Sequence, residues 1–170
     1  MGSSVTLSKK AQAVVVSIVV IWLVAIAGLV AATAMTQAGD NSTAPNAGAL
    51  ERNVAGVEEM GLNATAFAFS DIYGDEYGAA GILCAGETTE SIAQNFGLGA
   101  AELEPLELGP EGIPAGVSYI ALATQDGKVD FDKIDSSKVE LCQTPMTGVF
   151  DTRSMMPLSK MGPGLWALLG

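Results

Sequence analysis

Acidic side chains supply the densest group of potential ligands in this sequence. The segment DGKVDFDKID brings Asp130, Asp132 and Asp135 close together along the chain. Carboxylate oxygens bind Ca²⁺ in EF-hand loops, but alignment on Gly127 puts uncharged or basic residues at three of the ligand positions. We therefore reject a calcium loop and interpret these carboxylates as solvated charges of a hairpin, with a weak cation site as the lesser alternative.

Side chains that usually carry out catalysis are scarce. The chain has no histidine, which removes the usual general base, the usual haem and copper ligand, and the Ser/His and Cys/His nucleophile pairs. The two cysteines, Cys84 and Cys142, form no Cys-x-x-Cys motif and are too few to hold an iron–sulfur cluster. We expect a protein that is not an enzyme and that holds no cofactor and no metal ion.

A long apolar segment near the N-terminus dominates the hydropathy pattern. Residues 13–35 contain no charged side chain, and at ~1.5 Å per residue they span about 34 Å, enough to cross a bilayer core as one helix. A secretory signal has a shorter apolar region. Cleavage after Ala34 remains an alternative, but we expect the helix to be retained.

Charge around this segment predicts its orientation. Lys9 and Lys10 precede it, and the first basic residue after it is Arg52. Cationic flanks stay in the cytoplasm, so we expect a single-pass protein of the plasma membrane with its N-terminus inside. Both cysteines then lie in the exported part, and an exported pair with no third thiol predicts a Cys84–Cys142 disulfide.

The exported part is strongly acidic. It carries six basic and all 19 acidic side chains, a net charge of −13. Such a domain repels phosphate backbones, so nucleic acid is excluded as a partner and basic protein surfaces are favoured. Solubility alone is the alternative explanation of this charge.

Local patterns divide the chain into segments that together predict an α+β fold. We expect a cytoplasmic N-terminus at 1–12, a transmembrane helix at 13–35 and a linker with a short amphipathic helix at 36–62. An extracytoplasmic α+β domain at 63–142 and a Met- and Pro-rich arm at 143–170 follow. Within the domain we predict strands at 64–69, 79–84 and 117–124, a helix capped by Thr88 or Thr89, and a hairpin at Asp126-Gly127.

Two segments are predicted to bind partners. The C-terminal arm ends in GPGLWALLG, whose apolar side chains could contact their own domain, the lipid interface or a partner. Its proline and glycine residues favour an extended arm and argue against a return to the core of the domain. We expect its apolar side chains to bind a partner protein, with Trp166 as the anchor: Leu165, Trp166, Leu168 and Leu169. In the membrane helix a stripe of small residues would let another helix approach closely: Ser17, Ala25, Gly28 and Ala32.

The layout of the whole chain resembles a known class of membrane proteins. SKKAQAVVVSIVVIWLVAIAGLV, followed by an acidic Ala- and Gly-rich ectodomain with two cysteines, is similar to the small single-pass proteins of actinobacterial envelopes. Some of these are accessory subunits of the cytochrome bcc–aa3 respiratory supercomplex. The resemblance implies a cofactor-free structural role beside the electron-transfer subunits, with the acidic domain near a cytochrome c domain. The alternative is a freestanding, membrane-anchored domain that binds a ligand or cation.

Overall fold

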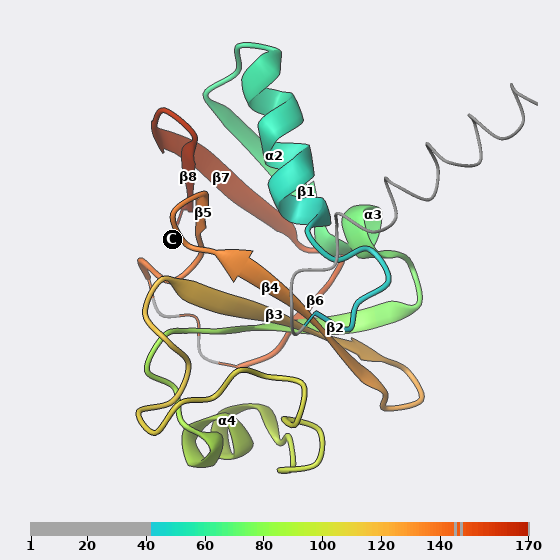
Figure 1. The fold of residues 1–170 in the computed structure, drawn as a ribbon. Helices are drawn as coiled ribbons and strands as arrows, with labels where there is room; N and C mark the ends of the chain where they lie inside the picture. Colours follow the sequence, from blue (N-terminus) through green and yellow to red (C-terminus); the bar gives the residue numbers. More distant parts are fainter. Residues whose placement is uncertain (1–41, 145, 147, 170) are drawn as a thin grey trace, which may run out of the picture. The chain divides into compact units, whose positions relative to one another are not determined.

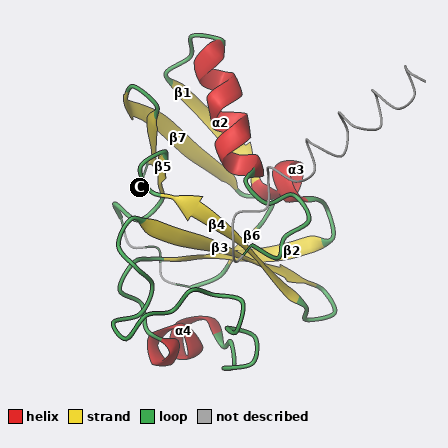
Figure 2. Ribbon diagram, in the orientation of Figure 1, coloured by secondary structure: helices red, strands yellow, loops and turns green. Residues whose placement is uncertain are grey.

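The computed structural model describes residues 42–144, 146 and 148–169. The expected cytoplasmic N-terminus and membrane helix, residues 1–35, lie outside this part of the chain. Within the described residues, no helix combines the length and the apolar character needed to cross a bilayer. The described residues form a small α+β domain, as the sequence predicts (Figures 1 and 2).

One four-stranded sheet forms the centre of the domain, and its strands are antiparallel throughout. In spatial order its strands are β4 (Val129–Asp135), β3 (Val117–Thr124), β2 (Tyr77–Leu83) and β6 (Phe150–Asp151). The predicted hairpin is confirmed, because β3 and β4 are joined through Asp126-Gly127. Gly127 has a φ of 86°, a conformation that glycine adopts without steric cost.

A second four-stranded sheet contains residues that the sequence assigned to the C-terminal arm. In spatial order its strands are β1 (Ala64–Ala68), β7 (Met155–Gly162), β8 (Leu165–Leu168) and β5 (Val139–Glu140). β1, β7 and β8 are antiparallel neighbours, whereas β5 runs parallel to β8.

Three helices are described: α2 (Ala49–Glu59), α3 (Phe69–Tyr73) and α4 (Thr89–Phe96). α2 is the short amphipathic helix that the sequence predicts within 36–62. Its apolar side chains Leu50, Val54 and Val57 are buried, whereas Met60, at the same helical spacing, follows the helix and is exposed. The cap of α4 is confirmed at Thr88, whose hydroxyl accepts a hydrogen bond from the backbone N–H of Ser91 in a reciprocal capping box.

Two apolar clusters lie on opposite faces of the central sheet. The main core is enclosed by both sheets, α2 and α3, and includes Leu50, Tyr73, Ile120 and Trp166. The second cluster covers the other face of the central sheet with side chains from α4 and the loop after it. Figure 1 shows α2 and α4 on opposite sides of the central sheet.

The predicted disulfide is confirmed. Cys84 follows β2 and Cys142 follows β5, their sulfurs are 2.07 Å apart, and their Cα atoms are 5.9 Å apart. The bond therefore joins the two sheets across a sequence separation of 58 residues. In the chain-entropy model a loop of this length gains about 4 kcal/mol of stability from the cross-link.

The prediction of an extended C-terminal arm is wrong. Residues 155–168 form the β7–β8 hairpin, and Trp166 is fully buried in the main core. Pro163 and Gly164 fit the hairpin turn, where Gly164 has a φ of 72°. Pro157 lies near the strand end, where its carbonyl accepts from Leu169 and the absence of its own N–H removes little pairing. The prolines and glycines thus shape the return of the tail into the domain.

We predict that Trp166→Ala destabilises the domain by about 3–5 kcal/mol, the usual range for removing a large aromatic from a core. Trp166→Phe should lose less, because a phenyl ring still fills most of the site; what disappears is the indole N–H bond to Glu58 (3.3 Å) and part of the buried ring volume. Chemical denaturation of the full chain in mild detergent, followed by near-UV circular dichroism, measures both. Leu169→Ala is the control, since Leu169 is 51% exposed; equal losses in the two alanine variants would contradict the prediction.

Candidate functional site

The residues predicted to bind partners are placed as follows. Ser17, Ala25, Gly28 and Ala32 lie outside the described residues. In the tail, Leu165 is half-buried, Trp166 and Leu168 are buried, and Leu169 is exposed. Three of the four tail side chains therefore contribute to the domain itself, and Trp166 is not available as an anchor for another protein in this fold.

The interpretation of the carboxylates in residues 126–135 as solvated charges is wrong for Asp130 and Asp132. Asp130 is 3% exposed and Asp132 is fully buried, whereas Asp135 is half-buried. Each buried carboxylate accepts a hydrogen bond from a tyrosine hydroxyl: Tyr77 donates to Asp130 (2.8 Å) and Tyr73 donates to Asp132 (2.6 Å). The alternation in VDFDKID places both aspartates on the same face as Ile134, and this period-two pattern is the sequence signal that could have identified them.

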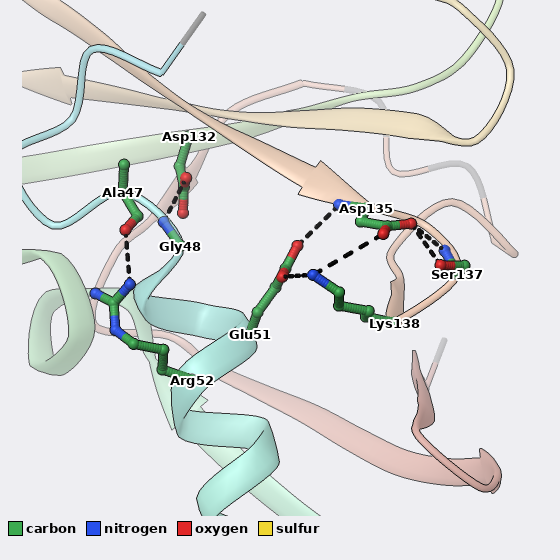
Figure 3. A network of polar contacts seen from close by, with 8 residues as sticks. All are labelled: Ala47, Gly48, Glu51, Arg52, Asp132, Asp135, Ser137 and Lys138. Atoms are coloured by element: carbon green, nitrogen blue, oxygen red, sulfur yellow. Dashed lines mark hydrogen bonds and ion pairs between the residues drawn. The ribbon is translucent and has the colours of Figure 1, made fainter. Parts of the chain in front are cut away.

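Asp132 connects β4, an edge strand of the central sheet, to the residues at the beginning of the domain. Its Oδ1 accepts from the backbone N–H of Gly48 (2.8 Å; Figure 3) and from the hydroxyl of Ser42 (3.4 Å). Burial raises the pKa of Asp132, and the hydrogen bonds from Tyr73 and Gly48 partly oppose that rise. Burial likewise raises the pKa of Tyr73, so its hydroxyl remains a donor at neutral pH.

The outer edge of β4 is closed by side chains that precede or belong to α2. Three consecutive outward N–H groups of the strand each donate to a side-chain oxygen: Phe131 to Thr43 (2.8 Å), Lys133 to Ser42 (3.0 Å) and Asp135 to Glu51 (3.0 Å). Glu51 also binds the ammonium group of Lys138 at 2.7 Å (Figure 3). An edge whose donors are satisfied in this way offers no template for another strand.

The buried pairs Asp130–Tyr77 and Asp132–Tyr73 stabilise the fold. The carboxylates are withdrawn from solvent, and each is hydrogen-bonded to a tyrosine whose pKa is raised by burial. A general acid or base has to reach a substrate proton within hydrogen-bond distance, which this arrangement does not offer. Within the part of the chain that the structure describes, no cluster of three or more His, Cys, Asp or Glu side chains could hold a metal ion.

A pocket of about 570 Å³ lies beside the disulfide. Glu87 and Glu140 both line it, and their carboxylates accept the backbone N–H groups of Cys84 (3.0 Å) and Cys142 (2.7 Å). Burial raises the pKa of Glu87. The remaining wall includes Ser136, Gln143 and Met146, so the pocket combines acceptor oxygens with an apolar side.

The strongest charge asymmetry of the domain lies in residues 86–112, which we call the acidic lobe. It contains six glutamates and neither lysine nor arginine. Leu103 and Leu106 anchor it to the second apolar cluster, whereas Glu102, Glu104 and Glu111 are exposed. The lobe therefore presents a negative surface on the α4 side of the central sheet.

Basic side chains do not compensate the acidic lobe, because most are used elsewhere. Five of the six in the described residues form ion pairs within the domain: Lys128–Asp130, Lys133–Glu107, Lys138–Glu51, Arg153–Asp151 and Lys160–Glu58. Only the Lys133 pair involves the lobe. Glu104 and Glu111 have no ion-pair partner among the described residues.

Comparison of the chain with protein-family models, curated proteins and solved structures yields no match.

We predict that the contributions of Asp132 and Asp135 to the free energy of unfolding change with pH in opposite directions. Burial raises the pKa of Asp132 above its unfolded value of about 3.9, so its contribution to stability is complete below that pH and is lost as the pH rises through the raised pKa. Asp132→Asn cannot titrate, so the stability of the wild type relative to this variant should fall as the pH rises from about 4.

Asp135→Asn is the matched control. Hydrogen bonds from Ser137 hold the pKa of Asp135 below its ordinary value, so its contribution is present above the unfolded pKa and is lost as the pH falls through the lowered one. Wild-type stability relative to Asp135→Asn should therefore rise with pH. Urea denaturation across a pH series measures both differences, and slopes of the same sign would rule out this assignment.

Proposed function

We propose that this protein is a non-catalytic accessory subunit of a membrane protein complex. Residues 13–35 anchor it in the plasma membrane with the N-terminus inside, and the disulfide-linked domain lies outside the cytoplasm. The domain contributes an interaction surface to the complex and carries out no chemistry of its own. The resemblance of the chain layout supports a respiratory electron-transfer supercomplex as the assembly.

The acidic lobe is the observation that carries this proposal. Its exposed glutamates are held on a folded platform, since Leu103 and Leu106 are buried beneath them, and no neighbouring cation neutralises Glu104 or Glu111 among the described residues. A fixed patch of one charge steers and orients an oppositely charged protein. The partner surface is therefore basic, and under the respiratory hypothesis it belongs to a cytochrome c domain.

The buried carboxylates support a role without catalysis. Asp130 and Asp132 are bound to Tyr77 and Tyr73 inside the main core, and the sequence has no histidine to act beside them. The surface of the domain, with the acidic lobe, is what a partner protein would recognise.

One observation favours a second candidate, a membrane-anchored domain that binds a small ligand. The pocket beside the disulfide is of the size that small molecules occupy, and Glu87 and Glu140 favour a cationic group. Under this hypothesis the protein works alone, and the pocket rather than the acidic lobe is the functional surface.

We predict that neutralising the lobe weakens assembly. The triple variant Glu102→Gln, Glu104→Gln and Glu111→Gln removes three exposed charges, each worth roughly 0.2–1 kcal/mol across an interface, so binding should weaken about 3- to 150-fold. Native membranes are extracted in mild detergent, and co-migration of the tagged full chain with larger membrane proteins is measured at several salt concentrations.

The matched control removes the same charge from another exposed site, with Asp71→Asn, Asp75→Asn and Glu76→Gln. These acids lie in and after α3, away from the acidic lobe. Co-migration should persist in the control and decline in the lobe variant. Equal co-migration of both variants and the wild type would remove the acidic lobe from the proposal.

The pocket hypothesis predicts a different outcome. The wild-type chain should then migrate alone, and its thermal unfolding should shift upward with small organic amines. Glu87→Gln should reduce that shift, because it removes the charge of the carboxylate that lines the pocket and leaves an oxygen for the Cys84 N–H. An unchanged unfolding temperature across the amine series would eliminate the pocket as a cation site.

A further inference from the structure

The outer edge of β4 is closed by side chains, whereas the outer edge of β1 is not. The edge of β4 is closed by Ser42, Thr43 and Glu51, as described above. β1 lies at the end of the second sheet, where it pairs with β7 on one side and with no described strand on the other. The segment from Met60 to Ser70 has no charged residue, and β1 contains neither the lysine nor the proline that commonly blocks an exposed edge.

The register identifies which backbone groups of β1 point outward. The N–H of Lys160 donates to the carbonyl of Asn63 (2.9 Å), so residues 63, 65 and 67 direct their backbone polar groups toward β7. By the alternation of an antiparallel ladder, Ala64 and Ala66 direct theirs toward the open edge. Both alanine side chains are exposed, which leaves room for another strand to approach.

The helix beside this sheet does not occupy the place of a next strand. Glu58, in the last turn of α2, reaches the indole of Trp166 (3.3 Å) and the ammonium of Lys160 (2.8 Å). These contacts place the end of α2 over the β7–β8 face, on the side of the main core. The lateral edge of β1 is therefore a separate surface.

We propose that β1 pairs antiparallel with β1 of a second copy of this chain, about a two-fold axis at Ala66. In this register Ala66 faces Ala66 of the other copy, and both exchange N–H···O bonds as a hydrogen-bonded pair. Ala64 faces Ala68, and Thr65 faces Phe67. The two four-stranded sheets become one continuous sheet across an isologous interface.

Three observations favour a second copy as the occupant. One face of β1 carries only alanines, of which Ala64 and Ala66 are exposed and Ala68 is buried, so only small side chains meet on that face when the strand pairs with itself about Ala66. Phe67 is half-buried at the margin of the main core and lies diagonally opposite its symmetry mate, within reach of an aromatic contact. The charge-free segment also lets two acidic domains meet where their mutual repulsion is weakest.

Introduced cysteines test the register directly. In a hydrogen-bonded antiparallel pair the Cα atoms are ~5.5 Å apart, within the ~4.4–6.8 Å that a disulfide requires. Ala66→Cys in the full chain, in mild detergent with a gentle oxidant, should give a disulfide-linked dimer on non-reducing gels. The native cysteines are joined to each other, so the introduced residue supplies the reacting thiol.

Ala64→Cys is the matched control, since Ala64 is also exposed on β1. Across the proposed axis its Cα lies about 14 Å from its mate, from ~3.4 Å per residue and ~4.8 Å between strands, which is too far for a disulfide. Ala66→Lys should abolish a dimer detected by light scattering and leave the unfolding free energy nearly unchanged, because it places like charges at the axis.

The following results would overturn the proposal. A wild-type chain that is monomeric, together with no cross-link in Ala66→Cys, excludes the pairing. Equal cross-linking of the two cysteine variants indicates random collision, and cross-linking of Ala66→Cys to a different protein assigns the edge to another partner. None of these results depends on the acidic lobe, so the pairing and the proposed accessory role can fail independently.

Discussion

The domain depends on the hydrogen bonds that compensate the burial of the Asp132 carboxylate. Removing an unpaired carboxylate from solvent costs several kcal/mol, so the surrounding chain has to supply donors. They come from three places in the chain: Ser42 before α2, Gly48 at the start of α2, and Tyr73 at the end of α3. One buried group thus ties the segment that enters the domain, two helices and the central sheet into a single arrangement.

The same arrangement governs the electrostatics of the surface. Lysine and arginine side chains serve mainly as internal partners: Lys160 holds α2 to β7, and Lys138 holds α2 to the β4–β5 turn. Because these cations are paired elsewhere, Glu104 and Glu111 after α4 have no ion-pair partner among the described residues, whereas Glu107 pairs with Lys133. The negative surface is therefore a property of the folded domain, beyond the excess of acidic residues in its composition, and it is directed to one side of the central sheet.

The outer edges of β4 and β1 differ in whether another strand can pair with them. The outer edge of β4 is protected by side-chain acceptors from 42–51. β1 carries no charge and has no described strand at its outer edge. The acidic lobe suits a basic partner bound by charge, and the β1 edge suits backbone pairing with a like chain. Since the lobe covers the central sheet and β1 belongs to the other sheet, the two surfaces can act separately.

The sequence alone determined the features that depend on near neighbours. The cap at Thr88, the Asp126-Gly127 hairpin and the stripe of α2 are fixed by residues a few positions apart, so local propensity suffices to predict them. The cysteine pairing also followed, because a chain with two cysteines allows one intramolecular bond. The tertiary structure decided the rest. Whether Trp166 is buried depends on β7, on β5 and on Glu58, 108 residues away, and whether Asp132 is solvated depends on Tyr73 and Gly48. Such contacts are set by how distant segments pack together, and no local pattern in the tail or in β4 specifies which segments will meet.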